Sequence, residues 1–240
     1  MNQNTALISA AILSAGIAAG GYFAGDGFLK ARLGDRYVTV KGVAEQDVTA
    51  DLAVWQIPIS ASGGDVASAQ AKIDGDVGRI RAFLTRYGIT DEEIALGGVQ
   101  VQDLLANAYR GDRQTDGPRF VVNQSVFVQT AKIAAVAQAS QAVGDLVKQG
   151  VVIAWSAGPS FIFTKLNDVK PPMIGEATRE ARKAAEQFAK DSGSRVGTIR
   201  HASQGVFSIL ARTAGDNTLE STQPEKTVRV VSTIEFYLAD

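Results

Sequence analysis

Residues 48–88 read VTADLAVWQIPISASGGDVASAQAKIDGDVGRIRAFLTRYG, and the hydrophobic period changes within this stretch. Its first part is an apolar run that indicates a strand, in which Pro58 suggests an edge or a bulge. After a glycine pair, apolar residues recur every three or four positions from Val66 to Tyr87. This spacing predicts a helix of about six turns, and Gly88 follows as its left-handed cap.

The same two patterns continue on both sides of this stretch. Apolar or alternating runs predict strands over Tyr37–Val43, Val48–Ser60, Ile94–Leu104, Arg119–Thr130, Val151–Thr164, Val196–Arg212 and Thr227–Leu238. Helical spacing predicts helices over Val66–Tyr87, over Ile133–Gln149 and from Pro171 onward. The order ββαββαβαββ mixes hairpins with helical crossovers. We therefore expect an α+β fold with mixed or antiparallel sheets covered by three helices, not a doubly wound parallel sheet.

The third helix combines a proline start with a stripe of small residues. Pro171 and Pro172 suit the first turn of a helix. Its other face carries charges of both signs, typical of a solvated helix and not of a basic recognition patch. We expect the buried stripe to consist of Ile174, Ala177, Ala181, Ala184 and Phe188.

The amino-terminal 25 residues contain no charged side chain, and Ala, Gly, Ile and Leu dominate Ala6 to Ala24. As a helix this segment would be about 28 Å long, close to the hydrocarbon core of about 30 Å. We expect residues 1–25 to form an N-terminal membrane helix, with a cleaved signal segment as the alternative. Residues 26–35 then form a linker and residues 36–240 the folded domain. Lys30 and Arg32, just after the span, favour the cytoplasm for that side.

Composition excludes several classes of function. The 24 basic and 25 acidic residues give a net charge of −1, so no bulk field recruits nucleic acid. Zero cysteines exclude disulfides and thiolate catalysis, and one histidine excludes a histidine-rich metal centre within one chain. No glycine-rich nucleotide loop of the familiar kinds occurs. We therefore expect no catalytic residue, no metal ligand, no cofactor and no nucleic-acid partner.

Two sets of polar residues still deserve a place as candidates. His201 could act as a base for Ser203 or Ser208, but both serines are near it in sequence and no nucleophile elbow occurs. We expect His201 to be an ordinary surface residue. Carboxylates could act as acid and base or bind calcium, and we expect them on a solvated helix flank or in a turn. They are Asp74 with Asp76, and Asp91 with Glu92 and Glu93.

Two further sequence features are explained without a binding function. Trp55 and Trp155 are expected to pack in the core or on a strand face, and not to form sugar platforms. Arg110-Gly111-Asp112 spells an adhesion tripeptide in a polar loop, where three common residues meet readily by chance.

Three pieces of the sequence carry a family resemblance: Val38–Gly42 with Val48–Asp51, Tyr87–Ile94, and Glu176–Gly193. In this order and spacing, from about Arg36 to Ala239, the chain resembles the SIMPL-domain family of bacterial cell-envelope proteins. It departs from the family at Thr49-Ala50-Asp51, where a Pro-Pro-Asp form is common. The resemblance implies an exported, periplasm-facing α+β protein that is prone to oligomerise. It also implies a loose link to envelope or stress physiology and no established catalytic residues.

The sequence therefore favours a non-enzymatic protein held in the bacterial inner membrane by a single N-terminal span. The resemblance implies that its soluble domain lies in the periplasm, and this outweighs the opposite signal of Lys30 and Arg32. We expect it to act by self-association or by binding another envelope protein through strand edges or loops. One alternative is an envelope hydrolase or metal-dependent enzyme that uses acidic residues. The other is a carrier of a small ligand or peptide, which requires a concave apolar pocket near Trp55 or Trp155.

Overall fold

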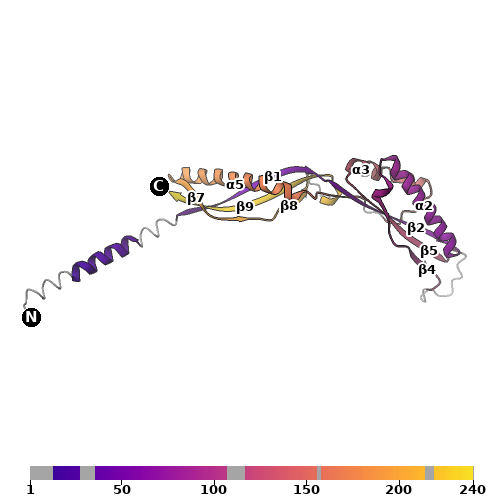
Figure 1. Ribbon diagram of the computed structural model, residues 1–240, viewed down its shortest axis with the longest axis horizontal. Coiled ribbons are helices and arrows are strands. Elements are labelled where there is room, and N and C mark those ends of the chain that lie inside the picture. The colour runs from indigo at the N-terminus through magenta and orange to yellow at the C-terminus, as the bar shows by residue number, and fades with distance from the viewer. Residues whose placement is uncertain (1–12, 28–35, 107–116, 156–157, 214–218, 240) are drawn as a thin grey trace, which may run out of the picture. The chain divides into compact units, whose positions relative to one another are not determined.

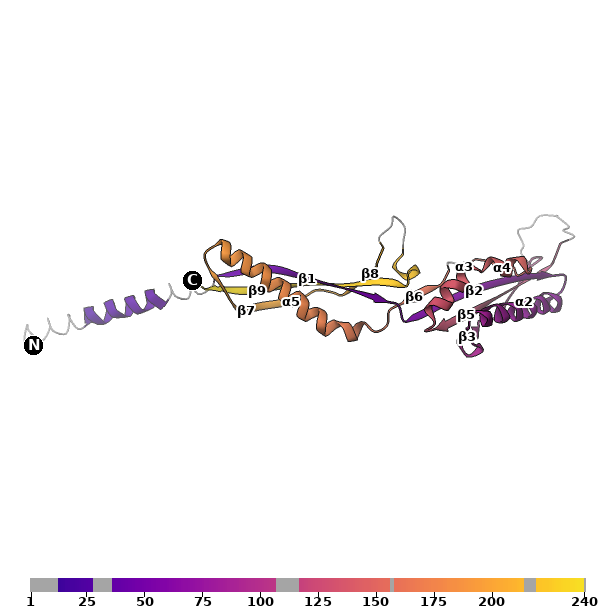
Figure 2. The same cartoon turned by 90° about the horizontal axis from the view of Figure 1, so that it is seen from above.

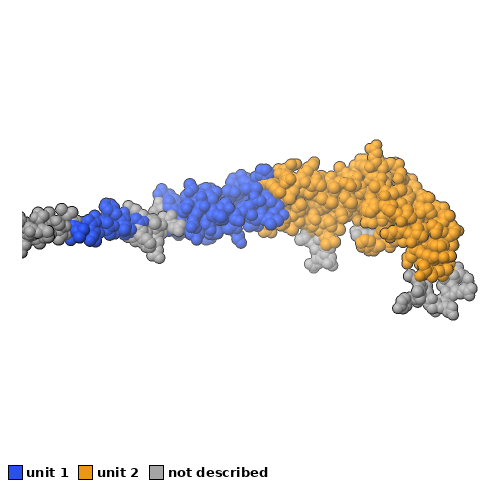
Figure 3. Space-filling model, turned by 60° about the horizontal axis from the view of Figure 1, so that its bottom comes forward, with its two compact units in different colours: residues 1–44, 171–207, 230–240 blue, residues 45–170, 208–229 orange. Residues whose placement is uncertain are grey.

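The structure is a computed structural model that describes residues 13–27, 36–106, 117–155, 158–213 and 219–239 (Figure 1). Contacts divide the chain into two compact units (Figure 3). Unit 1 comprises residues 1–44, 171–207 and 230–240, and unit 2 comprises residues 45–170 and 208–229.

After a helix over residues 13–27, the described elements alternate between strands and helices. In chain order they are β1 (Tyr37–Thr49), β2 (Leu52–Gly63), α2 (Val66–Arg86), η1 (Asp91–Glu93), β3 (Ile94–Leu96), β4 (Gln100–Asp103), β5 (Phe120–Thr130), α3 (Ile133–Gln141), α4 (Gly144–Lys148), β6 (Ser160–Ile162), α5 (Leu166–Asp191), β7 (Arg195–Gln204), β8 (Ser208–Ala211), η2 (Glu220–Thr222) and β9 (Glu225–Ala239).

Unit 2 is built on an antiparallel sheet in the order β3-β5-β2-β6, with β4 also paired to β5. Alternate residues of β2 are buried. Helices α2 and α3 pack against this strand, and their course along the sheet can be followed in Figure 2. The core is large and mainly aliphatic, and its biggest buried members include Trp55, Ile57, Ile73, Ile80, Phe83 and Leu84. The expected α+β class is confirmed.

Helix α2 begins and ends where the sequence predicts. The Asp65 side chain caps its first turn by accepting a hydrogen bond from the Ser68 N–H at 2.8 Å. Gly88 follows the helix with a φ of 82°, a left-handed conformation that favours glycine.

Unit 1 contains a sheet in the order β1-β9-β7, covered on one face by α5. Its small core consists of Val40, Ala181, Ala185, Ile234 and Phe236. A Cβ atom at Gly42 would lie 1.8 Å from the Ala177 carbonyl oxygen and 2.6 Å from the Ala181 nitrogen. Strand β1 and helix α5 therefore approach each other closely enough that only glycine fits there.

Helix α5 differs from its expected form in two respects. It begins at Leu166, so Pro171 and Pro172 lie inside it and not in its first turn. Of the expected buried stripe, Phe188 is 59% exposed, and Ile174 and Ala184 are only half-buried. The close contact with β1 selects small residues spaced four apart, and Phe188 lies beside that stripe. The buried residues are Met173, Ala177, Ala181, Ala185 and Ala189.

Glycines and turns also divide several expected elements. The strand expected over Ile94–Leu104 is two strands separated at Gly97 and Gly98. The strand expected over Val196–Arg212 is interrupted near Gly205, where a Cβ would lie 2.6 Å from the Val231 carbonyl oxygen.

Two other expected elements are shorter or broken. The helix expected over Ile133–Gln149 is divided into α3 and α4. Of the strand expected over Val151–Thr164, the structure shows β6 and one isolated bridge between Ile153 and Ile59.

The expected membrane segment, Ala6 to Ala24, lies partly outside the described residues. Among the helices that the structure describes, none is both long enough and apolar enough to cross a membrane.

Candidate functional site

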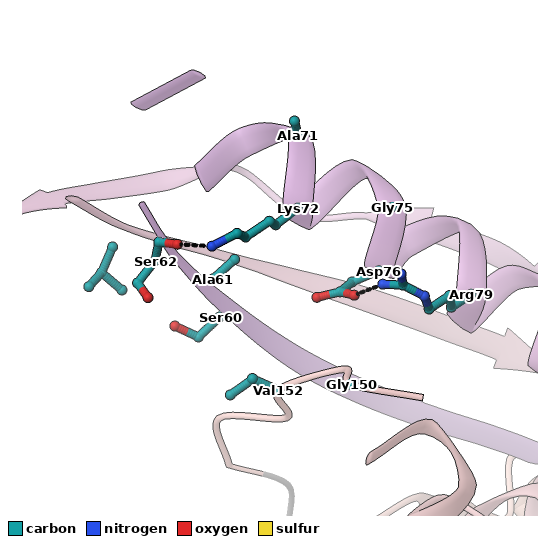
Figure 4. Close-up of a pocket in the computed structure, with 11 residues that line it drawn as sticks. Ser60, Ala61, Ser62, Ala71, Lys72, Gly75, Asp76, Arg79, Gly150 and Val152 are labelled. Atoms are coloured by element: carbon teal, nitrogen blue, oxygen red, sulfur yellow. Dashed lines mark hydrogen bonds and ion pairs between the residues drawn. The ribbon is translucent and has the colours of Figure 1, made fainter. Parts of the chain in front are cut away.

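Unit 2 contains a groove of about 640 Å³ lined by β2, α2, β5 and the segment that follows α4 (Figure 4). Helix α2 supplies Lys72, Gly75, Asp76 and Arg79. These residues are three or four positions apart, so they form one stripe along the helix. Because Gly75 has no side chain, it leaves an open space on this helix face between the charged residues.

The polar groups of the groove have defined partners. Lys72 Nζ donates to the Ser62 carbonyl oxygen at 2.7 Å, and Arg79 Nη1 lies 2.5 Å from Asp76 Oδ1 (Figure 4). Asp76 is only 5% exposed, which corrects the expectation that it lies on a solvated flank. Arg79 supplies the counter-charge that a buried carboxylate requires.

The remaining walls are small and neutral. Ser60 and Ser62 line the groove from β2 with their hydroxyl groups turned away from Lys72 (Figure 4), and Ala61, Ala71, Val121 and Val152 contribute apolar surface. The two serines are the hydroxyl-bearing residues among those that line the groove, and no lining residue is a histidine. The arrangement is suited to binding a small polar molecule, because Lys72 offers a charge and hydrogen-bond donors.

A second hollow, of about 300 Å³, lies on the other face of the unit 2 sheet and is lined in part by Val54, Phe127 and Trp155. Trp155 is 74% exposed, so it does not pack as expected, whereas Trp55 is 1% exposed and lies in the core as expected. The exposure of Trp155 leaves this hollow open. The carrier hypothesis required a concave apolar pocket, and Gln56 and Ser160 make this one partly polar.

The expected carboxylate triplet separates into structural contacts. Glu93 accepts hydrogen bonds from Thr130 Oγ1 at 2.5 Å, the Thr90 N–H at 2.7 Å and Lys132 Nζ at 2.9 Å. Partial burial raises the pKa of Glu93, but these bonds outweigh it and lower the pKa to about 2. Asp91 lies 3.4 Å from Arg81. Glu93 thus ties the turn that follows α2 to the end of β5 and to Lys132, which precedes α3.

The candidate Asp74 and the further carboxylate Asp51 each have local hydrogen-bond partners. Asp74 accepts from Gln70 at 2.9 Å, and Asp51 accepts from the Thr164 N–H at 2.8 Å and its hydroxyl at 2.9 Å. Within the described ranges, no group of three or more His, Asp or Glu side chains could hold a metal ion.

The lone histidine lies on β7. His201 is exposed and opposite Glu235 of β9, and Ser203 and Ser208 are exposed on β7 and β8. Arg110-Gly111-Asp112 lies outside the described residues.

Strand β7 is the most exposed long strand of unit 1. It lies at one end of the strand order β1-β9-β7. All its residues from Thr198 to Gln204 are exposed. Ile199 and Ala202 pair with Phe236 and Ile234, which are buried in the core beneath α5. Since directly paired residues point to the same face, helix α5 leaves this side of β7 uncovered.

The groove was not predicted from the sequence. Its signal was present in the spacing of Lys72, Gly75, Asp76 and Arg79, which places two cations and a glycine on one helix face. The apolar stripe of α2 predicts which face of the helix packs on the core. It does not predict which segments lie next to the opposite face.

Comparison with known proteins gives one family match of wide coverage. The SIMPL profile, described as "Protein of unknown function (DUF541)", matches residues 38–236. A search of curated proteins finds no match. Among solved structures, the chain is similar to the regulatory subunit of aspartate kinase from Thermus flavus, with 16% sequence identity over 82% of this chain and 89% of that chain. The TM-score of 0.21 is too low to carry an argument about fold or function.

Proposed function

Because the chain belongs to the SIMPL family of proteins of unknown function, we propose a function that rests on contact and not on catalysis. In this proposal the protein is held in the bacterial inner membrane by its apolar N-terminal segment, and its folded part lies in the periplasm. Copies of the chain associate with one another through β7 of unit 1, or β7 binds another envelope protein. The process served is envelope or stress physiology.

The observation that carries the proposal is the exposure of β7. An edge strand offers unpaired backbone groups to another chain, and Ile199 is 43% exposed on the face that α5 covers elsewhere. A partner strand or helix seated on β7 would bury Ile199 and Ala202 and continue the layer formed by α5.

A membrane tether supports the same proposal. Copies confined to a plane meet at a raised effective concentration, so weak edge contacts are sufficient for assembly. The family resemblance to proteins that oligomerise points the same way.

Light scattering of the full chain in detergent tests the association. We expect oligomers whose mass falls to that of one chain when Ile199 is replaced by lysine, because the new charge lies on the uncovered face of β7. The matched control is Val147→Lys, which places a lysine at an exposed valine of α4 in unit 2. A wild-type protein that is monomeric at every concentration, or equal masses for the two variants, contradicts the proposal.

The non-catalytic part has a separate test. We expect hydrolase and metal-dependent activity screens of the full chain to stay at background. A substrate turned over by the wild type and no longer by His201→Ala or Asp51→Asn would overturn this part in favour of an envelope enzyme.

A further inference from the structure

We propose that the groove of unit 2 binds a small organic monocarboxylate, with the carboxylate at Lys72 and a short apolar body along the floor beside Gly75. This inference is independent of whether copies of the chain associate, because every lining residue of the groove belongs to unit 2.

The charge of the groove favours a single negative charge. Its lining contains two cations, Lys72 and Arg79, and one carboxylate, Asp76, which leaves a net charge of +1. The charge of Arg79 is already matched by Asp76 at 2.5 Å. Lys72 has no carboxylate partner among the described residues, and its one contact is the neutral Ser62 carbonyl at 2.7 Å.

Hydrogen-bond capacity points to an acceptor. The ammonium of Lys72 has three N–H donors, and the Ser62 carbonyl uses one of them. The other two N–H donors of Lys72 therefore remain for an acceptor in the groove. A carboxylate accepts several such bonds at once, and a charged bond of this kind is stronger than a neutral one.

The shape of the floor leaves room for the rest of the ligand. Gly75 lies between the two cations, and a Cβ atom built on it would meet only Arg79 Nη1, at 3.9 Å. The neighbouring walls at Ala61, Ala71 and Val152 are short and apolar. They suit a chain of a few methylene groups, and a bulky polar ligand such as a nucleotide would leave them unused.

Two glycine variants of the same helix give a matched comparison. Gly75→Leu fills the floor of the groove, whereas Gly78→Leu adds the same side chain where nothing lies within 4 Å. Both replace a glycine by a better helix former, so neither is expected to unfold α2. Lys72→Gln removes the charge that we assign to carboxylate binding.

Calorimetric titration of the full chain with butyrate and hexanoate tests the proposal. We expect saturable binding that strengthens by up to about fourfold for each added methylene. We also expect a loss of about tenfold or more in Gly75→Leu and of about tenfold in Lys72→Gln, with Gly78→Leu unchanged.

Three outcomes would overturn the proposal. The first is no saturable binding of either acid, and the second is equal binding by Gly75→Leu and Gly78→Leu. The third is a better fit by another chemistry: hexanol bound as tightly as hexanoate would show an apolar site, and inorganic phosphate bound more tightly would show a phosphate site.

Discussion

The two units of the chain solve the same packing problem in opposite ways. Unit 2 covers its sheet with α2 and buries large side chains such as Trp55 and Phe83. Unit 1 covers its sheet with a helix whose buried stripe is mostly alanine, and the helix and sheet backbones come together at Gly42. The comparison teaches that unit 2 gains stability from buried apolar area, whereas unit 1 depends on close approach and leaves β7 uncovered.

The largest effect is expected from a truncation in unit 2. Phe83→Ala removes a ring that is 1% exposed, which leaves a cavity and costs about 3–5 kcal/mol of unfolding free energy. Both tryptophans lie in unit 2, so tryptophan emission during urea unfolding reports this unit. The control is Val66→Ala at an exposed position of the same helix, expected to change the free energy by about 0.5 kcal/mol or less. Equal losses in the two variants would contradict the large-core account.

In unit 1 the most destabilising change is expected to be the addition of a side chain at Gly42. Gly42→Ala places a methyl group against the Ala177 carbonyl and should cost about 1–3 kcal/mol. Amide hydrogen exchange in α5 and β9 measures it, since a displaced helix exchanges faster. Gly64→Ala, where nothing lies within 4 Å, is the control. Unchanged exchange in Gly42→Ala would refute the close approach.

Glu93 provides a pH-dependent effect confined to unit 2. Its pKa is about 2 in the folded chain and about 4.3 in an unfolded one. Its contribution to stability is therefore full above about pH 4.3 and is lost as the pH falls through about 2. We expect Glu93→Gln to cost about 1–2 kcal/mol at pH 7, after allowance for partial exposure, and almost nothing at pH 2.

Urea unfolding of Glu93→Gln is compared with that of Glu92→Gln, a change at an exposed neighbour. The comparison distinguishes the loss of the Glu93 hydrogen bonds from the mere loss of a negative charge. A cost for Glu93→Gln that stays the same from pH 7 to pH 2 would show that its hydrogen bonds do not depend on the ionised carboxylate.

The smallest expected effect is that of Phe188→Ser. Because the ring is exposed on α5, the unfolding free energy should change by about 0.5 kcal/mol or less. Circular dichroism during thermal unfolding measures it. A loss of about 2 kcal/mol would place Phe188 in the core, as the helical spacing alone suggested.

The sequence predicts the parts of the fold that local patterns control. Helix α2 is bounded as expected because a capping aspartate and Gly88 mark its ends, and β5 and β9 alternate as expected. The prediction that Phe188 is buried was wrong, because a helical period defines the buried stripe only to within one position. The contact with Gly42 decides which stripe is buried.

The groove could not be inferred for a related reason. Lys72 and Arg79 read as solvated charges until the segment that follows α4 supplies an opposite wall at Gly150 and Val152. Asp76 is buried although it does not belong to the apolar period of α2, so that period does not predict its burial.

The exposed strand of unit 1 offers the most direct test of the contact function. Backbone amides of residues 195–204 can be followed by hydrogen exchange in the full chain in detergent, at low and at high protein concentration. We predict that they exchange slowly only where light scattering reports oligomers, because a partner then pairs with or covers β7. Oligomers in which these amides exchange as fast as in the monomer would contradict the account.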